Sequence, residues 1–175
     1  MALTKVIGSG IGTVTDQFAD ANMATGSVVQ VTNVDVHAQV AITSTSYAAV
    51  SGLSIAFTCS SASNKILIIT DMQTYKNNTT DNDGFELGVA AAGTAINYFN
   101  GYNIRGAGVN VGSYGTVGNS FYYHPNSTSA ITYTVIARST AGGAFLINAN
   151  NASGAALNAT AQSSTSTFTI MEISV

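Results

Sequence analysis

Hydrophobic side chains recur at every second position along most of the chain from residue 27 onward. Leu53, Ile55 and Phe57 alternate with small or polar residues, and residues 131–137 repeat this pattern. A period of two is typical of β-strands with one buried face. Turn-forming residues and the single proline, Pro125, separate these runs. The clearest strand candidates are residues 27–34, 36–42, 53–57, 65–75, 85–89, 131–138, 144–148 and 165–175.

One strand candidate breaks the alternation. Lys65 is followed directly by four apolar residues, 66–69. A continuous apolar run predicts a strand that is covered on both faces or lies at the centre of a symmetric assembly. Lys65 then either reaches solvent or pairs with a carboxylate such as Glu172, or it protects the strand from edge-to-edge pairing.

The composition favours β-structure throughout. Charged residues make up 7% of the chain, and only six of its 175 residues are leucine. Thr, Val, Ile, Tyr and Phe are common instead, and these residues suit a pleated surface. Eight to ten short strands in one chain of this length predict a single all-β domain, an antiparallel β-sandwich, jelly roll or closed barrel.

Charge and cysteine content exclude several functions. The net charge is −3 and the five Lys and Arg residues are scattered, so we expect no nucleic-acid partner. No apolar run approaches the roughly 20 residues of a membrane-spanning helix, and the opening residues lack the apolar stretch of a signal peptide. We therefore expect synthesis in a cytoplasm-like compartment without membrane insertion. Cys59, the single cysteine, is expected to be a small buried hydrophobe.

Residues 1–26 differ from the rest of the chain. Glycines punctuate this segment, and it is too short to bury a core of its own. We interpret it as an arm that attaches residues 27–175, the β-domain, to another protein. Its apolar side chains are the expected attachment residues: Leu3, Val6, Ile7, Ile11 and Phe18.

Catalytic and metal-binding patterns are weak. Neither His37 nor His124 accompanies a nucleophile motif, and Asp71 and Glu172 do not form a recognisable glycosidase pair. We predict no enzymatic activity and no cofactor. The loop with Asp81 and Asp83 does not fit a calcium hand, which leaves a plain solvated turn or a looser Ca²⁺ site.

Seven of the fifteen aromatic residues fall between residues 98 and 123, interleaved with Asn, Gly and Arg105. Tyrosines beside adaptable hydrogen-bonding residues are typical of recognition surfaces. We predict that residues 97–123 lie at an exposed end of the domain and bind a receptor or glycan; the alternative is a role in the core or between subunits. The candidate recognition residues are Tyr98, Tyr102, Asn103, Arg105 and Tyr114.

Five motifs occur in order along the β-domain: GSVVQV (26–31), YAAVSGLSI (47–55), SNKILI (63–68), STSAITY (127–133) and IMEI (170–173). As a set they resemble the C-terminal domain of fibre and appendage proteins of tailed phages that infect marine and freshwater bacteria. The opening MALTKVIGSGI is similar to the start of small structural proteins of such phages. The resemblance spans about residues 26–175 and is weakest between about 76 and 120.

This resemblance implies a trimeric jelly roll of the tumour-necrosis-factor shape on the virion surface. One sheet would face the three-fold axis, which explains a strand covered on both sides. The expected trimer-interface residues are Ile66, Ile68, Tyr133 and Val135. A tail fibre or receptor-binding tip is the first interpretation, with a host cell-surface glycan or protein as its partner. A head decoration protein or capsid fibre is the alternative, and a lectin-like carbohydrate-binding module is the third.

Overall fold

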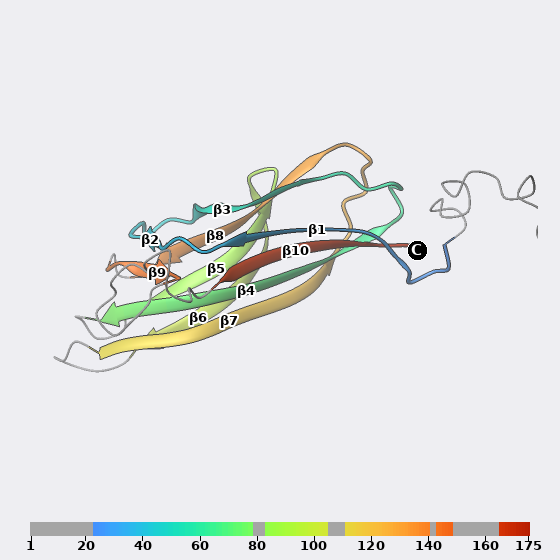
Figure 1. Cartoon of the computed structure of the whole chain (residues 1–175). Helices are drawn as coiled ribbons and strands as arrows, with labels where there is room; N and C mark the ends of the chain where they lie inside the picture. Colours follow the sequence, from blue (N-terminus) through green and yellow to red (C-terminus); the bar gives the residue numbers. More distant parts are fainter. Residues whose placement is uncertain (1–22, 79–82, 105–110, 141–142, 149–164) are drawn as a thin grey trace, which may run out of the picture.

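The computed structural model describes residues 23–78, 83–104, 111–140, 143–148 and 165–175, and Figure 1 shows its ten strands. The described residues contain no helix. The strands are β1 (Val28–Val36), β2 (Val40–Ile42), β3 (Ala48–Phe57), β4 (Lys65–Asn78), β5 (Asp83–Ala91), β6 (Thr94–Ile104), β7 (Val111–Tyr123), β8 (Ile131–Ser139), β9 (Phe145–Ile147) and β10 (Ser166–Ile173).

Two antiparallel sheets pack face to face. Sheet A contains β1, β10, β4 and β7 in this order, and the short strands β9 and β2 extend it beyond the end of β10. Sheet B has the order β3, β8, β5 and β6. Strands near the start of the chain pair with strands near its end, and central strands pair with each other, which is the double Greek-key connectivity of a jelly roll. The prediction of an all-β antiparallel sandwich is confirmed.

The core lies between the sheets and is built by the alternating residues of both. Ile66 and Ile68 of β4 and Tyr133 and Val135 of β8 are each at most 1% exposed. Each such side chain contributes on the order of 1.5–3 kcal/mol by leaving water. Because a single chain already buries these four residues completely, the reasoning that assigned them to a trimer interface fails; they hold the two sheets of one chain together.

Two aromatic side chains of the core stack on each other. Phe85 of β5 and Phe145 of β9 stack across the sandwich with ring centroids 3.9 Å apart and planes 6° apart. Cys59 follows β3 and is buried, as predicted. Burial raises the pKa of its thiol to about 11, and the nearby charge of Glu172 adds to this effect.

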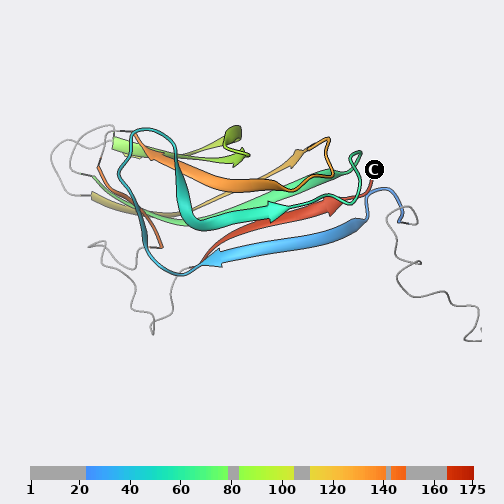
Figure 2. The same cartoon turned by 90° about the horizontal axis from the view of Figure 1, so that it is seen from above.

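The described chain begins and ends at the same end of the sandwich (Figures 1 and 2). The Gly26 N–H donates to Ser174 O at 2.8 Å, and the Ser174 N–H donates to Ser27 O at 2.9 Å. The backbone is therefore fixed to sheet A from residue 26 onward. Most of the predicted arm, residues 1–22 with all five attachment candidates, lies outside the described residues.

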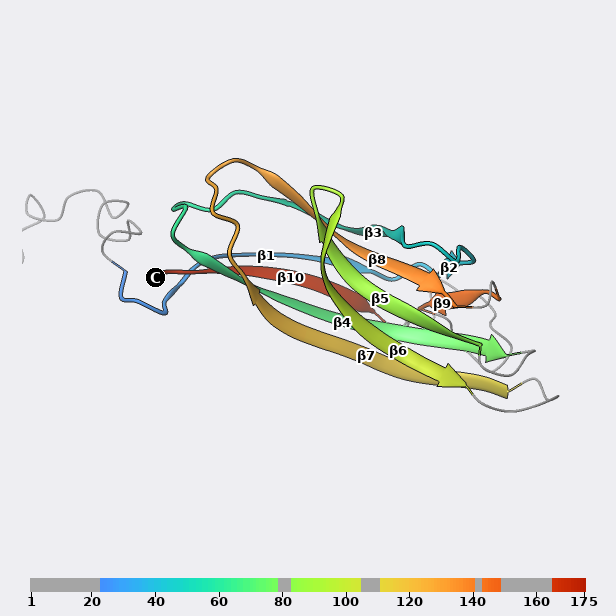
Figure 3. The ribbon, with the colours of Figure 1, turned by 180° about the vertical axis from the view of Figure 1, so that it is seen from behind.

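The aromatic segment 97–123 is built differently from the prediction. Residues 97–104 belong to β6 and residues 111–123 belong to β7, the edge strands of sheet B and sheet A. They lie on the same side of the sandwich (Figure 3), where Asn119 Nδ2 donates to Asn97 Oδ1 at 3.0 Å. As strands, these segments divide their aromatic residues between inward and outward faces.

Candidate functional site

One end of the outer face of sheet A is apolar across four strands, whereas Asn33, Asp71 and Thr169 face outward farther along the sheet. In the strand register Tyr122 lies opposite Leu67, Leu67 opposite Met171, and Met171 opposite Val31. Tyr122 is 64% exposed and Val31 53% exposed, while Leu67 and Met171 are half-buried. Together with their neighbours these residues form what we term the apolar face: Val28, Val31, Leu67, Ile69, Tyr122, Met171 and Ile173.

The apolar face explains the unbroken run at 66–69. Ile66 and Ile68 point into the core, and Leu67 and Ile69 point outward. In one isolated chain this second face is open to solvent. Contiguous exposed apolar surface of this kind marks interaction sites in soluble proteins.

The outer face of sheet B has a different chemistry. Its central part carries small residues such as Ser54 and Thr134, whose hydroxyls hydrogen-bond at 2.7 Å. Ala56 and Thr132, opposite one another on β3 and β8, are exposed. Small hydroxylated residues on a strand face are readily solvated, so sheet B needs no covering partner in this region.

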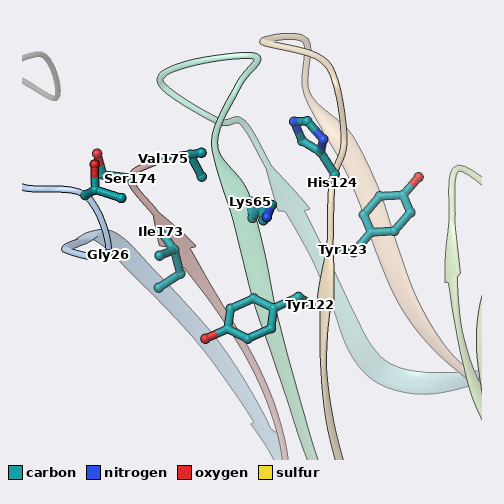
Figure 4. Close-up of a pocket in the computed structure, with 9 residues that line it drawn as sticks. Gly26, Lys65, Tyr122, Tyr123, His124, Ile173, Ser174 and Val175 are labelled. Carbon is teal, nitrogen blue, oxygen red and sulfur yellow. The ribbon is translucent and has the colours of Figure 1, made fainter.

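A shallow cavity of about 410 Å³ lies at one end of the apolar face (Figure 4). Tyr122 and Ile173 continue the apolar surface into it, and Lys65 and His124 also line it. Lys65 is exposed at the start of β4, beside Ile173 in the register. It does not pair with Glu172, because that residue is on the inward side of β10 and is fully buried.

Glu172 is the centre of a buried polar cluster. Its Oε1 accepts hydrogen bonds from Ser60 N and Ser60 Oγ, both at 2.8 Å, and from Asn64 Nδ2 at 2.8 Å; Ser61 N lies at 3.4 Å. Its Oε2 accepts from Gln30 Nε2 at 2.5 Å. Burial alone would raise the pKa of Glu172, but the hydrogen bonds from Asn64, Gln30 and Ser60 outweigh it and hold the pKa below the usual 4.5.

A second cluster lies on the outer face of sheet B. Tyr47 Oη donates to Glu86 Oε2 at 2.6 Å, and Arg138 donates to the same oxygen from Nε and Nη2, both at 2.8 Å. The Tyr98 ring lies against Tyr47 with 4.8 Å between centroids, and the Arg138 guanidinium carbon is 5.0 Å from the Tyr47 ring centroid. We term these four residues, Tyr47, Glu86, Tyr98 and Arg138, the tyrosine platform.

The charges of the platform stabilise one another. Burial and the hydrogen bond to Glu86 raise the pKa of Tyr47 to about 12. The hydrogen bond from Tyr47 lowers the pKa of Glu86, and the hydrogen bond and charge of Arg138 lower it further against the effect of burial. At neutral pH the platform therefore holds a neutral phenol, a carboxylate and a guanidinium.

Tyr98 is the one predicted recognition residue whose side chain the structure describes, and it is 58% exposed. Tyr102 and Asn103 lie on β6 and Tyr114 lies on β7, but their side chains are outside the described part of the structure. Arg105 is outside it altogether.

Sequence reasoning missed the other three platform residues, Tyr47, Glu86 and Arg138. They are distant from Tyr98 in the chain and meet it only through strand pairing. The available signal was the presence of Glu86 and Arg138 within strands of a chain with very few charges.

The remaining candidates do not converge on a catalytic or metal site. His37 and His124 are exposed, and His37 Nε2 contacts Asp35 Oδ2 at 2.5 Å. Asp71 faces outward on sheet A, on the opposite face from Glu172. The described residues contain no group of three or more His, Cys, Asp or Glu side chains placed to hold a metal ion.

The possible Ca²⁺ site lies mainly outside the described residues. Asp81 is not described, and only the backbone of Asp83 is, at the start of β5. Within the described ranges there is also no helix long and apolar enough to span a membrane.

Comparisons with known proteins give little information about family. No protein-family model and no curated protein matches the chain. Among solved structures, the chain is similar to the insecticidal delta-endotoxin Cry8Ea1 of Bacillus thuringiensis, with 14% identity and a TM-score of 0.33. This match covers 78% of the chain and 19% of the toxin, so the chain corresponds to about a fifth of that protein's length.

Proposed function

We propose that the protein is a structural component of a bacteriophage particle, a homotrimeric jelly roll that projects from the virion surface and is attached through residues 1–26. A tail fibre or receptor-binding tip is the favoured location. The proposal rests on the resemblance of the five motifs to phage fibre and appendage domains, and the fold is compatible with it. The structural observation that carries its trimeric part is the apolar face on sheet A.

The apolar face supports oligomerisation because it runs without a break across four strands at one end of a single sheet. Tyr122, Leu67, Met171 and Val31 form a row across the whole width of the four long strands. Aromatic residues and Met are enriched in protein interfaces, and charged residues are depleted from their centres. A closed ring of copies about a three-fold axis would cover this face on every chain.

The two ends of the sandwich support a projecting arrangement. The described chain starts at residue 23, beside the C-terminal end of β10 (Figure 1). The ends of β4 and β6 and the start of β7 lie at the opposite end. An arm bound to the particle would therefore leave the opposite end pointing away from it.

Sedimentation velocity on the full-length protein and on Leu67→Glu tests the oligomer. The unmodified chain should sediment as a trimer. The variant should sediment as a folded monomer, because a carboxylate in the middle of the interface would lose its hydration without a partner. Ala56→Glu, which adds the same charge to an exposed position on sheet B, should remain trimeric.

Location on the particle tests the virion role. Cryo-electron microscopy of the phage that encodes the chain, with the protein labelled by a specific antibody, should place it at the tail. Label on the head would favour the decoration or capsid-fibre alternative, and absence of the protein from purified particles would refute a structural role.

A lectin-like carbohydrate-binding module is the second candidate function. The exposed tyrosine platform on sheet B favours it. Such a module would bind soluble oligosaccharides without being part of a particle. An oligosaccharide-binding assay together with location on the particle therefore separates it from the first candidate.

A further inference from the structure

The tyrosine platform presents a ring face and two charged groups on one open surface. Tyr98 is more than half exposed, and Tyr47 supports one side of its ring. The Arg138 side chain is 37% exposed and that of Glu86 is 27% exposed. Ala49, on the same outer face, is also exposed.

Gly88 makes this arrangement sterically possible. It lies between Tyr98 on β6 and Ile136 on β8 in the register of sheet B. A Cβ at position 88 would lie 3.1 Å from Tyr98 Cδ1, 3.3 Å from Ile136 Cγ1 and 2.7 Å from Asn97 O. The absence of a side chain at Gly88 therefore lets the Tyr98 ring lie close across β5.

The polar groups of the platform retain unused hydrogen-bonding capacity. All three hydrogen bonds to Glu86 end on Oε2. Glu86 Oε1 accepts no hydrogen bond from the described residues, and Arg138 Nη1 donates no hydrogen bond to them. An acceptor and a donor on two partly exposed side chains thus have no hydrogen-bond partner among the described residues.

Their spacing matches a small polar ring. Glu86 and Gly88 are two residues apart on β5, so their Cα atoms are about 7 Å apart, and Tyr98 is directly opposite Gly88. A ligand about one sugar ring wide can lie on Tyr98 and reach Glu86 and Arg138. Asn100, opposite Glu86 in the register, is at the same position along the sheet.

We propose that the tyrosine platform binds a neutral sugar residue of a glycan. The apolar C–H face of the sugar would lie on the Tyr98 ring. Two neighbouring hydroxyls would donate to Glu86 Oε1 and accept from Arg138 Nη1, which are both charge-assisted hydrogen bonds. Its biological role as a receptor contact rests on the proposed function, whereas the binding itself does not.

The charge of the platform selects among ligand classes. Glu86 and Arg138 neutralise each other, so a phosphate or an acidic sugar finds no surplus positive charge among the described residues around the platform. A neutral sugar can pack on the Tyr98 ring and hydrogen-bond to the paired charges of Glu86 and Arg138.

The test uses the full-length protein and an array of neutral and acidic oligosaccharides, followed by NMR titration of the best neutral binder in solution. We expect saturable binding to neutral members. Tyr98→Ala should weaken binding about tenfold, as expected for loss of an aromatic contact. Glu86→Gln should weaken it several-fold, since one charge-assisted hydrogen bond becomes neutral.

Two further variants keep the result interpretable. Thr132→Ala, on the outer face of the same sheet but outside the platform, should bind like the unmodified protein. Gly88→Ala changes none of the four platform residues, but its Cβ would displace the Tyr98 ring. This variant should therefore also weaken binding. Melting temperatures measured on the same samples establish that each variant is folded.

The proposal would be overturned if the protein bound no member of the array or bound acidic members alone. It would also be overturned if Tyr98→Ala and Glu86→Gln bound as tightly as the unmodified protein. None of these results bears on the virion role, which sedimentation and particle location decide. Conversely, a protein that binds sugar through Tyr98 but is absent from particles would retain this site and lose the proposed function.

Discussion

Replacement of Glu172 by Gln should destabilise the protein far more than a conservative change of shape suggests. The Glu172 carboxylate is fully buried, and its partners are neutral groups of two separate segments: Gln30 on β1, and Ser60, Ser61 and Asn64 in the turn between β3 and β4. These hydrogen bonds fix the turn between β3 and β4 to the end of sheet A.

The magnitude follows from what glutamine retains. Its carbonyl oxygen can replace Oε1, but the bonds from Ser60 and Asn64 lose the charge that roughly doubles their strength. Its NH₂ group then faces the NH₂ group of Gln30, which is also held by Thr58 O at 2.7 Å and cannot turn without losing that bond. A neutral side chain is easier to desolvate, which offsets part of the loss. We expect a net loss of about 3 kcal/mol.

Thermal unfolding at pH 7 measures this loss. For a chain of this size, about 3 kcal/mol corresponds to a fall in Tm of roughly 6–12 °C. The matched control is Glu86→Gln, which makes the same chemical change in a partly exposed ion pair with Arg138. It should cost less than about 1 kcal/mol.

The dependence on pH provides a second readout. The folded-state pKa of Glu172 is below 4.5, its ordinary value in an unfolded chain. The carboxylate therefore stabilises the fold fully above about pH 4.5, and this contribution is lost as the pH falls through the folded-state pKa. The difference in Tm between the unmodified protein and Glu172→Gln should shrink as the pH falls in that range. An unchanged Tm at pH 7, or a difference that is the same at pH 3 and pH 7, would refute this account of the cluster.

Two further predictions concern the backbone and the arm. Gly52→Ala should lower the free energy of unfolding by about 2–4 kcal/mol, because Gly52 has φ +85° and a Cβ would lie 2.7 Å from Val36 Cγ2. The control is Gly93→Ala, which has φ +80° but open space around the added Cβ, and it should lose only about 1–2 kcal/mol. Chemical denaturation measures both. Deletion of residues 1–26 should leave a folded trimer in sedimentation that no longer joins phage particles, and normal incorporation of the shortened chain would show that another segment attaches it.

The sequence was sufficient to predict every strand except β6 and β7, because one buried face imposes a period of two. It predicted a single strand from 36 to 42, but the structure ends β1 at Val36 and starts β2 at Val40. Asn148, buried and with φ 59°, causes the break: its Nδ2 donates to Val36 O at 2.7 Å and to Ala38 O at 3.1 Å. A contact over 110 residues leaves no local signal.

The candidate sites were harder to predict for the same reason. Tyr98 was identified from the local density of aromatic residues, but that density indicated a recognition loop where the chain forms two edge strands. In a strand, neighbouring aromatic residues point in opposite directions, so Tyr98 faces outward and Phe99 packs against the core. Whether Tyr98 meets Glu86 and Arg138 depends on strand order and register, which the pattern of a single strand does not contain.

The two outer faces of the sandwich provide the last step of the reasoning about function. Inward positions of both sheets follow one rule, burial of apolar side chains, so they determine the fold and carry no information about partners. Outward positions differ: one end of sheet A is apolar across four strands, while sheet B combines small hydroxylated residues with the tyrosine platform. Ser, Thr and Asn already make the surface soluble in a chain with so few charges, so solubility does not require the Glu86–Arg138 pair on this strand face. In the trimer that we propose, other copies would cover the apolar face and each chain would present one tyrosine platform. Three weak sites in one trimer would bind a glycan-coated surface far more tightly than one site does.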